Sequence, residues 1–213
     1  MDHTKQLSKH RIEALTDGIF AVAMTLLVIE LRLPDHGPGD NEAALVEALR
    51  HLVPNFVSWV ISFFVLALFW IGHHRLFHYV RHVDGRLLAI TTFTLAGASL
   101  LPFASAANGH FPSFAGQVVY SLVMAMMGLA ALMTVSYLKR HPELCVHPLP
   151  LDVYGAARFR TCGIICVAVL AVAISYAWPG KNIGNIAFLL LAFLRPLGER
   201  VGRRYAGKHS PLQ

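Results

Sequence analysis

The chain has 213 residues, of which 55% are hydrophobic and only 14% are charged. Water-soluble domains carry about 25% charged residues, so this composition, with a mean hydropathy of +0.54, argues against a soluble protein and for a chain solvated mainly by lipid. The net charge of +6 does not indicate a nucleic-acid partner, because the basic residues lie between long apolar runs and form no continuous basic face.

The apolar runs predict six membrane-spanning helices, since one crossing takes about 20 apolar residues. Four runs reach that length without a charge, and two shorter ones are extended by charged residues at their ends, where long side chains can reach the membrane surface. The predicted fold is therefore all-α, with a single six-helix transmembrane domain over residues 1–213. The predicted spans are 12–33, 53–76, 86–107, 113–138, 159–178 and 182–198.

Two of the connections have features of their own. Residues 34–52 form an acidic outer loop, and 41–52 within it predict a short amphipathic helix that lies on the outer surface. Residues 139–160 contain two His-Pro steps and one Leu-Pro step, which predict an irregular cytoplasmic connector rather than a domain.

The basic residues predict the orientation of these spans. With six crossings, all but three of the 18 lysines and arginines fall on the side that holds the N-terminus, and the exceptions are Arg32, Arg50 and Lys181. Loops rich in Lys and Arg stay on the cytoplasmic side, so both termini are predicted to be cytoplasmic.

The start of the first span carries an aspartate at an unusual place. Asp17 lies at the edge of an apolar run, where a carboxylate is costly unless it has a partner or reaches water. Arg11 precedes it by six residues, about 240° around a helix, so these two side chains cannot pair on one helix face. Asp17 must therefore find its partner on another helix or remain close to water.

The residues around this aspartate resemble a known family signature. The chain reads Arg11, three residues, Leu15, Thr16, Asp17 and Gly18. This is similar to the Arg-x-x-x-Phe-Ser-Asp-Gly signature of the transmembrane protein 175 family of potassium channels, prokaryotic branch, with Leu for Phe and Thr for Ser. Further similarity lies at the end of the second apolar run, in Phe69-Trp70-Ile71-Gly72-His73-His74-Arg75, and at Leu101-Pro102-Phe103.

The resemblance implies a function. It implies a homotetramer around a central pore in a bacterial or archaeal plasma membrane, which passes K⁺ and, less well, other monovalent cations. The sequence has no Thr-Val-Gly-Tyr-Gly loop, so a filter of backbone carbonyls is excluded, and side chains of the first helix would form the constriction. By motif alignment the pore-lining residues are Val22, Thr25, Leu26 and Ile29. The signature residues would serve assembly or gating; they are Arg11, Thr16, Asp17 and Gly18, with possible partners at Trp70, His73 and His74.

Helix geometry agrees with this alignment. At 100° per residue, the predicted pore-lining residues and Gly18 fall within about 60° of Val22 and form one stripe. Asp17 lies about 140° from Val22 and faces away from the stripe. Four copies of such a stripe would make an apolar gate, although a stripe of this kind is also what an ordinary packed helix face looks like.

A histidine cluster supports the alternative function. His74, His78 and His82 recur at i,i+4, a spacing that can bind a transition metal, which would make the chain a metal-binding transporter or enzyme. A surface helix extension explains the same cluster without a metal. A purely structural membrane protein is the third alternative. We predict no enzyme activity and no catalytic residues, because the sequence has no nucleophile elbow, phosphate-binding loop or paired catalytic carboxylates. We also predict no metal and no cofactor.

Overall fold

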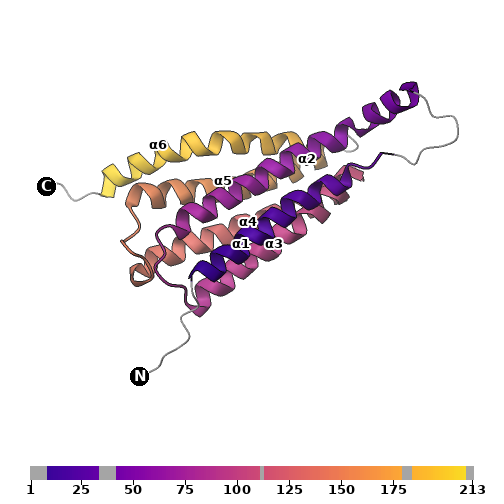
Figure 1. Ribbon diagram of the computed structural model, residues 1–213. Coiled ribbons are helices and arrows are strands. Elements are labelled where there is room, and N and C mark those ends of the chain that lie inside the picture. Colours follow the sequence, from indigo (N-terminus) through magenta and orange to yellow (C-terminus); the bar gives the residue numbers. More distant parts are fainter. Residues whose placement is uncertain (1–8, 34–41, 111–112, 179–183, 210–213) are drawn as a thin grey trace.

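The computed structural model describes residues 9–33, 42–110, 113–178 and 184–209, and it shows a bundle of long helices (Figure 1). These residues form six α-helices: α1 (Lys9–Leu26), α2 (Glu42–Phe77), α3 (Gly85–His110), α4 (Phe114–Arg140), α5 (Leu151–Ala177) and α6 (Leu191–His209). Three 3₁₀ helices accompany them: η1 (Leu27–Glu30), η2 (Pro142–Leu144) and η3 (Gly184–Leu190). The predicted all-α fold is confirmed.

The helices have apolar surfaces that no described part of the chain covers. Five of those described, α1 with η1 and α2 to α5, are long and apolar enough to cross a membrane. Large side chains such as Leu122, which is 69% exposed, and Phe103, which is 66% exposed, point out of the bundle. Soluble monomers rarely expose so much apolar surface, so these faces meet lipid or another subunit. The chain is a multi-pass membrane protein.

The sixth predicted span differs from the other five. In place of one continuous helix over 182–198, the structure has η3 followed by α6, which extends to His209. Within the described residues α6 does not reach the length and apolarity of a membrane span, since its second half is rich in arginine. A membrane crossing by this segment stays a prediction.

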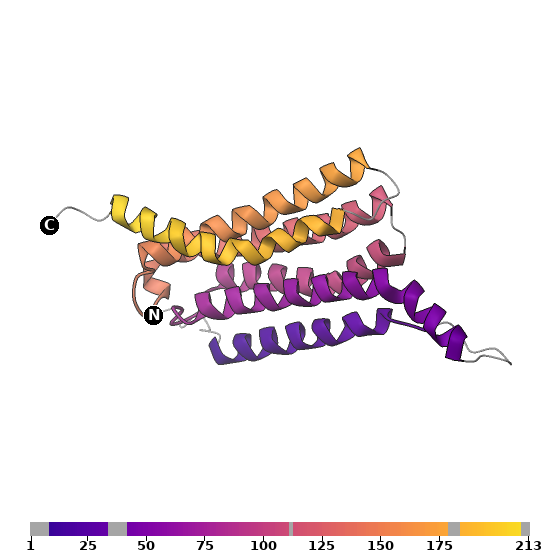
Figure 2. The ribbon, with the colours of Figure 1, turned by 90° about the horizontal axis from the view of Figure 1, so that it is seen from above.

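Helices that follow one another in sequence pack side by side, so that α3, α4, α5 and α6 form a consecutive series. The first helix, α1, packs mainly on α2 and α3 and lies at one edge of the bundle (Figure 2). The main core lies between the helices and includes Phe20, Leu66, Leu101 and Met124. This arrangement holds α1 along one side and leaves much of its surface free.

A second core closes the end of the bundle where α2 meets α3. Phe77, Leu87 and Leu138 are fully buried there. The α2–α3 connection is tied to the α4–α5 connection by two backbone hydrogen bonds, from Arg81 N to Leu144 O at 2.7 Å and from Val146 N to Tyr79 O at 2.8 Å. The two connections therefore form one ordered junction.

The predicted surface helix over 41–52 is wrong as a separate element. Residues 42–52 are helical, but they form the start of α2, which continues without a break through Pro54 to Phe77, and residue 41 lies outside the described residues. Figures 1 and 2 show this part of α2 extending beyond the bundle. A proline inside a helix removes one backbone hydrogen bond and more often bends a membrane helix than ends it.

The predicted connector over 139–160 is also wrong in its second half. The helix α5 begins at Leu151, directly after Pro150, whose backbone has φ −57° and ψ 144°. Proline lacks an N–H group, and the first N–H groups of a helix have no partner within the helix, so proline fits at a helix start. Only residues 141–150 connect α4 to α5, and η2 lies among them.

Asp84 anchors the start of α3 and gives the first testable prediction. Its carboxylate accepts hydrogen bonds from Leu87 N at 2.8 Å and from the Tyr137 hydroxyl at 2.6 Å. Burial raises the pKa of Asp84, but these two hydrogen bonds outweigh that effect and hold the pKa below its ordinary value. A lowered pKa stabilises the fold above the ordinary aspartate pKa, and this stabilisation is lost as the pH falls through the lowered value.

Tyr137→Phe should therefore lower the free energy of unfolding by about 1 kcal/mol at pH 7. The difference from the unmodified protein should shrink as the pH approaches 3. Thermal unfolding of both proteins in detergent at pH 7 and pH 3 measures this difference in stability. Tyr176→Phe is the matched control, because Tyr176 is 78% exposed. An effect of Tyr137→Phe that is equal at both pH values would contradict a bond to ionised Asp84.

Candidate functional site

The helix α1 has two apolar faces with different surroundings. One face is buried against α2 and α3 through side chains that recur every three or four residues: Ile12, Thr16, Phe20 and Ala23. On the other face Val22 is 56% exposed, Leu26 41% and Ile29 47%. The predicted pore-lining residues thus lie on the side of α1 that this chain leaves uncovered.

The last turn of this segment departs from the predicted geometry. Leu27–Glu30 is the 3₁₀ helix η1 and not a continuation of the α-helix. A 3₁₀ helix turns by about 120° per residue, so Ile29 lies almost directly in line with Leu26 along the axis instead of about 60° around from it. Ile29 remains exposed, so the uncovered stripe continues to the end of η1.

Thr25 lies in the same stripe, and its hydroxyl group donates a hydrogen bond within the helix. Its Oγ1 donates a hydrogen bond to the backbone oxygen of Val22 at 2.8 Å. The proton of the hydroxyl therefore points back along the helix, and the lone pairs of the exposed oxygen are left without a partner from α1. Such an oxygen can accept a hydrogen bond or approach a cation.

Asp17 has a defined partner on the neighbouring helix. Its Oδ1 accepts a hydrogen bond of 2.8 Å from Nε1 of Trp70 on α2. Trp70 in turn lies beside His74, with ring centroids 5.8 Å apart. The structure therefore brings together the aspartate of the signature and two of the three residues that sequence analysis names as its possible partners.

The third named residue, His73, lies in the same small contact. Its ring stacks on Phe77 with centroids 4.1 Å apart, and its Nε2 is buried without a hydrogen-bond partner among the described residues. Thr16 is 2% exposed, and its Oγ1 is also buried without a hydrogen-bond partner among the described residues. Both line a cavity of about 10 Å³, together with Asp17 and Trp70. Phe77 is not among the partners that sequence analysis names for Asp17.

Two residues of the signature make no such contact within the described part of the chain. Arg11 is exposed and has no carboxylate within ion-pair distance there. Gly18 is also exposed, and a Cβ atom added to it would meet no atom within 4 Å. Packing inside one chain therefore does not explain why this position is a glycine.

A contact between a glutamate and a histidine, at the opposite end of α1 and η1, is also absent from the sequence-based prediction. Glu30, at the end of η1, lies 3.8 Å from Nδ1 of His110 at the end of α3. The two residues are 80 positions apart in the chain and belong to no motif, so no sequence pattern signals their contact. This contact joins the end of the uncovered stripe to α3.

The structure gives the histidine alternative no support. The helix α2 ends at Phe77, so His78 and His82 do not continue the helical repeat that would bring three rings to one face. In the described part of the chain, no group of three His, Cys, Asp or Glu side chains could hold a metal ion.

The fold and the site together define a class: a multi-pass helical membrane protein whose first helix keeps an apolar stripe uncovered and is fixed to the second helix by an Asp–Trp bond. Residues 11–102 match the family model described as the endosomal/lysosomal potassium channel TMEM175. The first half of the chain is thus similar to the TMEM175 family, as the motifs in this half predict. The family model, the bacterial relatives and the similar solved structure are all described as potassium channels.

Relatives extend the similarity to most of the chain. A potassium channel of Streptomyces collinus is 36% identical over 125 residues, which cover 56% of this chain and 59% of that one. A potassium channel of Chryseobacterium is 28% identical over 192 residues, which cover 89% and 94%. The chain thus spans little more than half of the length of the first relative. The crystal structure of a potassium-selective TMEM175 homologue from Chamaesiphon minutus has the same fold, with 23% identity, a TM-score of 0.73, and 89% and 97% of the two chains covered.

Proposed function

We propose that the chain forms a potassium channel, in which four copies surround a pore lined by α1. The observation that carries this proposal is the stripe of Val22, Leu26 and Ile29, which is uncovered in the single chain and lies in the segment that matches the channel family. Lipid could cover the same stripe. However, Gly18 lies on the same side of α1, and no contact within the described part of the chain explains a glycine there.

The chemistry of the stripe suits a cation pathway without a carbonyl filter. Four apolar side chains at the level of Val22 would form a narrow ring from which water withdraws easily. One turn further along, four Thr25 oxygens would present lone pairs to a cation that has lost part of its hydration shell. We propose that K⁺ passes these layers better than Na⁺, because its hydration shell is held less tightly, and that other monovalent cations pass more weakly.

The signature residues would position the stripe instead of contacting the ion. Asp17 is bonded to Trp70 and directed toward α2, so a change at this bond would alter how α1 lies against α2. We propose that Asp17, Trp70 and the neighbouring histidines set the tilt of α1 and so the width of the pore. We also propose that both termini are cytoplasmic and that the protein resides in a bacterial or archaeal plasma membrane.

A flux measurement tests the proposed activity. Purified protein is reconstituted in liposomes that contain K⁺, with an outward K⁺ gradient, and a protonophore is added. K⁺ that leaves through the channel should make the interior negative and draw protons in, which a pH dye reports. A Na⁺ gradient of the same size should give a smaller signal. Empty liposomes and liposomes treated with valinomycin set the lower and upper limits. If the reconstituted, folded protein gives the signal of empty liposomes, the proposed function is wrong.

Gly18 provides a test of the proposed tetramer. Replacing glycine by alanine inside a helix stabilises the helix by up to about 1 kcal/mol, and here the added methyl group meets nothing in the single chain. Gly18→Ala should nevertheless reduce the recovery of the tetramer if a neighbouring copy approaches α1 closely at this point. Size-exclusion chromatography with light scattering measures the recovery. Gly85→Ala, which also meets no atom within 4 Å, is the matched control, and a tetramer unaffected by Gly18→Ala contradicts a close approach there.

A further inference from the structure

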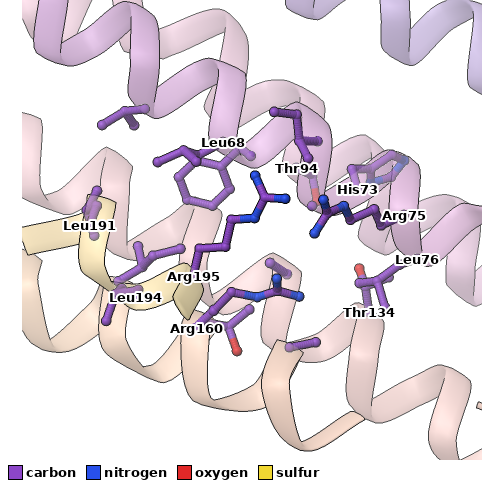
Figure 3. Close-up of a pocket in the computed structure, with 18 residues that line it drawn as sticks. Leu68, His73, Arg75, Leu76, Thr94, Thr134, Arg160, Leu191, Leu194 and Arg195 are labelled. Atoms are coloured by element: carbon purple, nitrogen blue, oxygen red, sulfur yellow. The ribbon is translucent and has the colours of Figure 1, made fainter. Parts of the chain in front are cut away.

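A cavity lies between α2 and the pair formed by α5 and α6, away from the uncovered stripe of α1. Its volume is about 110 Å³, and α3 and α4 contribute one side of its lining. Most of the lining is apolar, as Figure 3 shows for Leu68, Leu191 and Leu194. Such a space between membrane helices suits a hydrocarbon chain.

Three arginines converge on one end of this cavity. Arg75 comes from α2, Arg160 from α5 and Arg195 from α6, and Figure 3 shows their guanidinium groups directed toward the same space. The positive charges of Arg75 and Arg195 act on Arg160. The negative charge of Glu199 acts on it as well. Within the described residues, neither Arg75 nor Arg160 has a carboxylate within ion-pair distance, and Arg195 lies 3.7 Å from an exposed Glu199.

A second, larger cavity adjoins the first at the arginines. It has a volume of about 470 Å³, and its lining also includes Arg203 and two carboxylates, Asp152 and Glu199. The two cavities together are lined by four arginines and two carboxylates, so the site keeps an excess of positive charge. Arg160 is half-buried, whereas the other two arginines of the first cavity are exposed. Like charges brought together repel one another, and an anion bound between them relieves that cost.

We propose that these cavities bind one anionic phospholipid. Its phosphate group would lie among Arg75, Arg160 and Arg195, and one acyl chain would enter the apolar cavity between α2 and α6. Arginine suits this task because its planar guanidinium group binds phosphate oxygens through two parallel hydrogen bonds. Basic pockets between membrane helices bind anionic headgroups in this way. A free phosphate ion would satisfy the arginines but would leave the apolar cavity empty, so the lining favours a lipid.

Native mass spectrometry of the purified protein tests the proposal without any measurement of ion flux. Palmitoyl-oleoyl phosphatidylglycerol should bind in preference to the phosphatidylcholine with the same acyl chains. Arg160→Gln should weaken binding of phosphatidylglycerol about fivefold, since one basic side chain near the headgroup is removed. Arg140→Gln is the matched control, because Arg140 is exposed and lies outside both cavities.

A second variant tests the apolar cavity, where the acyl chain is proposed to bind. Gly72 lines the first cavity, and a side chain added there meets no atom within 4 Å, so Gly72→Leu should fill part of the cavity without removing a charge. This variant should also weaken binding of phosphatidylglycerol several-fold while the protein elutes as a single folded species. The proposal is overturned if phosphatidylcholine binds equally well, or if Arg140→Gln weakens binding as much as Arg160→Gln. It is equally overturned if glycerol 1-phosphate displaces the lipid at equal concentration, or if Gly72→Leu leaves binding unchanged.

Discussion

Val22→Asn is expected to raise the conductance for K⁺ several-fold and to lower the preference for K⁺ over Na⁺. Val22 is 56% exposed on the uncovered face of α1, and in four copies it would form the apolar ring of the constriction. An amide side chain holds water where an isopropyl group excludes it, so the barrier for every hydrated cation falls and discrimination falls with it. Unitary conductance and the reversal potential with K⁺ on one side and Na⁺ on the other measure the two effects.

The matched control is Leu122→Asn on α4. Leu122 is 69% exposed but lies on a face of the bundle that the proposed pore does not use. The same polar substitution there should reduce the amount of folded protein and leave the reversal potential unchanged. If Val22→Asn, Thr25→Val and Leu26→Asn all leave conductance and reversal potential unchanged, α1 does not line the pore.

Asp17→Asn is expected to lower the recovery of the tetramer or the open probability, with little change in the reversal potential. The bond from Trp70 Nε1 to the Asp17 carboxylate joins α1 to α2 at 2.8 Å, and a hydrogen bond to a charged group contributes about 1.5–3 kcal/mol. In Asp17→Asn the amide oxygen can still accept this bond but lacks the charge that strengthens it, whereas Trp70→Phe removes the bond entirely. The double variant should therefore lose little more than Trp70→Phe alone, because both changes act on one interaction.

Trp178→Phe serves as the control for Trp70→Phe. Trp178 is 53% exposed at the end of α5, far in the sequence from the signature, and the same loss of an indole N–H should have little effect there. A large shift in the reversal potential on Asp17→Asn, at normal tetramer recovery, would place Asp17 in the ion pathway. Additive losses in the double variant would show that Asp17 and Trp70 act through separate contacts.

The existence of the membrane helices can be predicted from the sequence, but the positions where some helices begin and end cannot. The apolar runs predict the helices, because lipid requires every backbone group of a span to be bonded within the helix. The outer helix over 41–52 was expected to end before Pro54, but a proline only weakens one turn, and the helix continues. The start of α5 at Leu151 was missed because Pro148 and Pro150 indicate a loop as readily as a helix start.

In the candidate site, too, some features can be predicted from the sequence and others cannot. Spacing on a helix indicates that Asp17 turns away from Val22, and in the structure Asp17 is bonded to Trp70 on α2. Spacing does not identify the contact of Glu30 with His110, which depends on how two distant helix ends meet. It also does not predict that the last turn before Leu31 is a 3₁₀ helix, because the energies of the two helix types differ little over four residues.

The most direct test of the account is block of the K⁺ current by Ag⁺ in a single-cysteine variant. Cys145, Cys162 and Cys166 are replaced by alanine, and Val22→Cys is introduced into that background for recording in planar bilayers. Ag⁺ is close to K⁺ in size and bonds irreversibly to thiolates, so a cysteine in the pore is modified from the aqueous phase. The account predicts unitary K⁺ currents that stop after Ag⁺ is added to Val22→Cys and persist in the cysteine-free background and in Leu122→Cys. Currents that persist in Val22→Cys, or the absence of any K⁺ current from the folded protein, would contradict it.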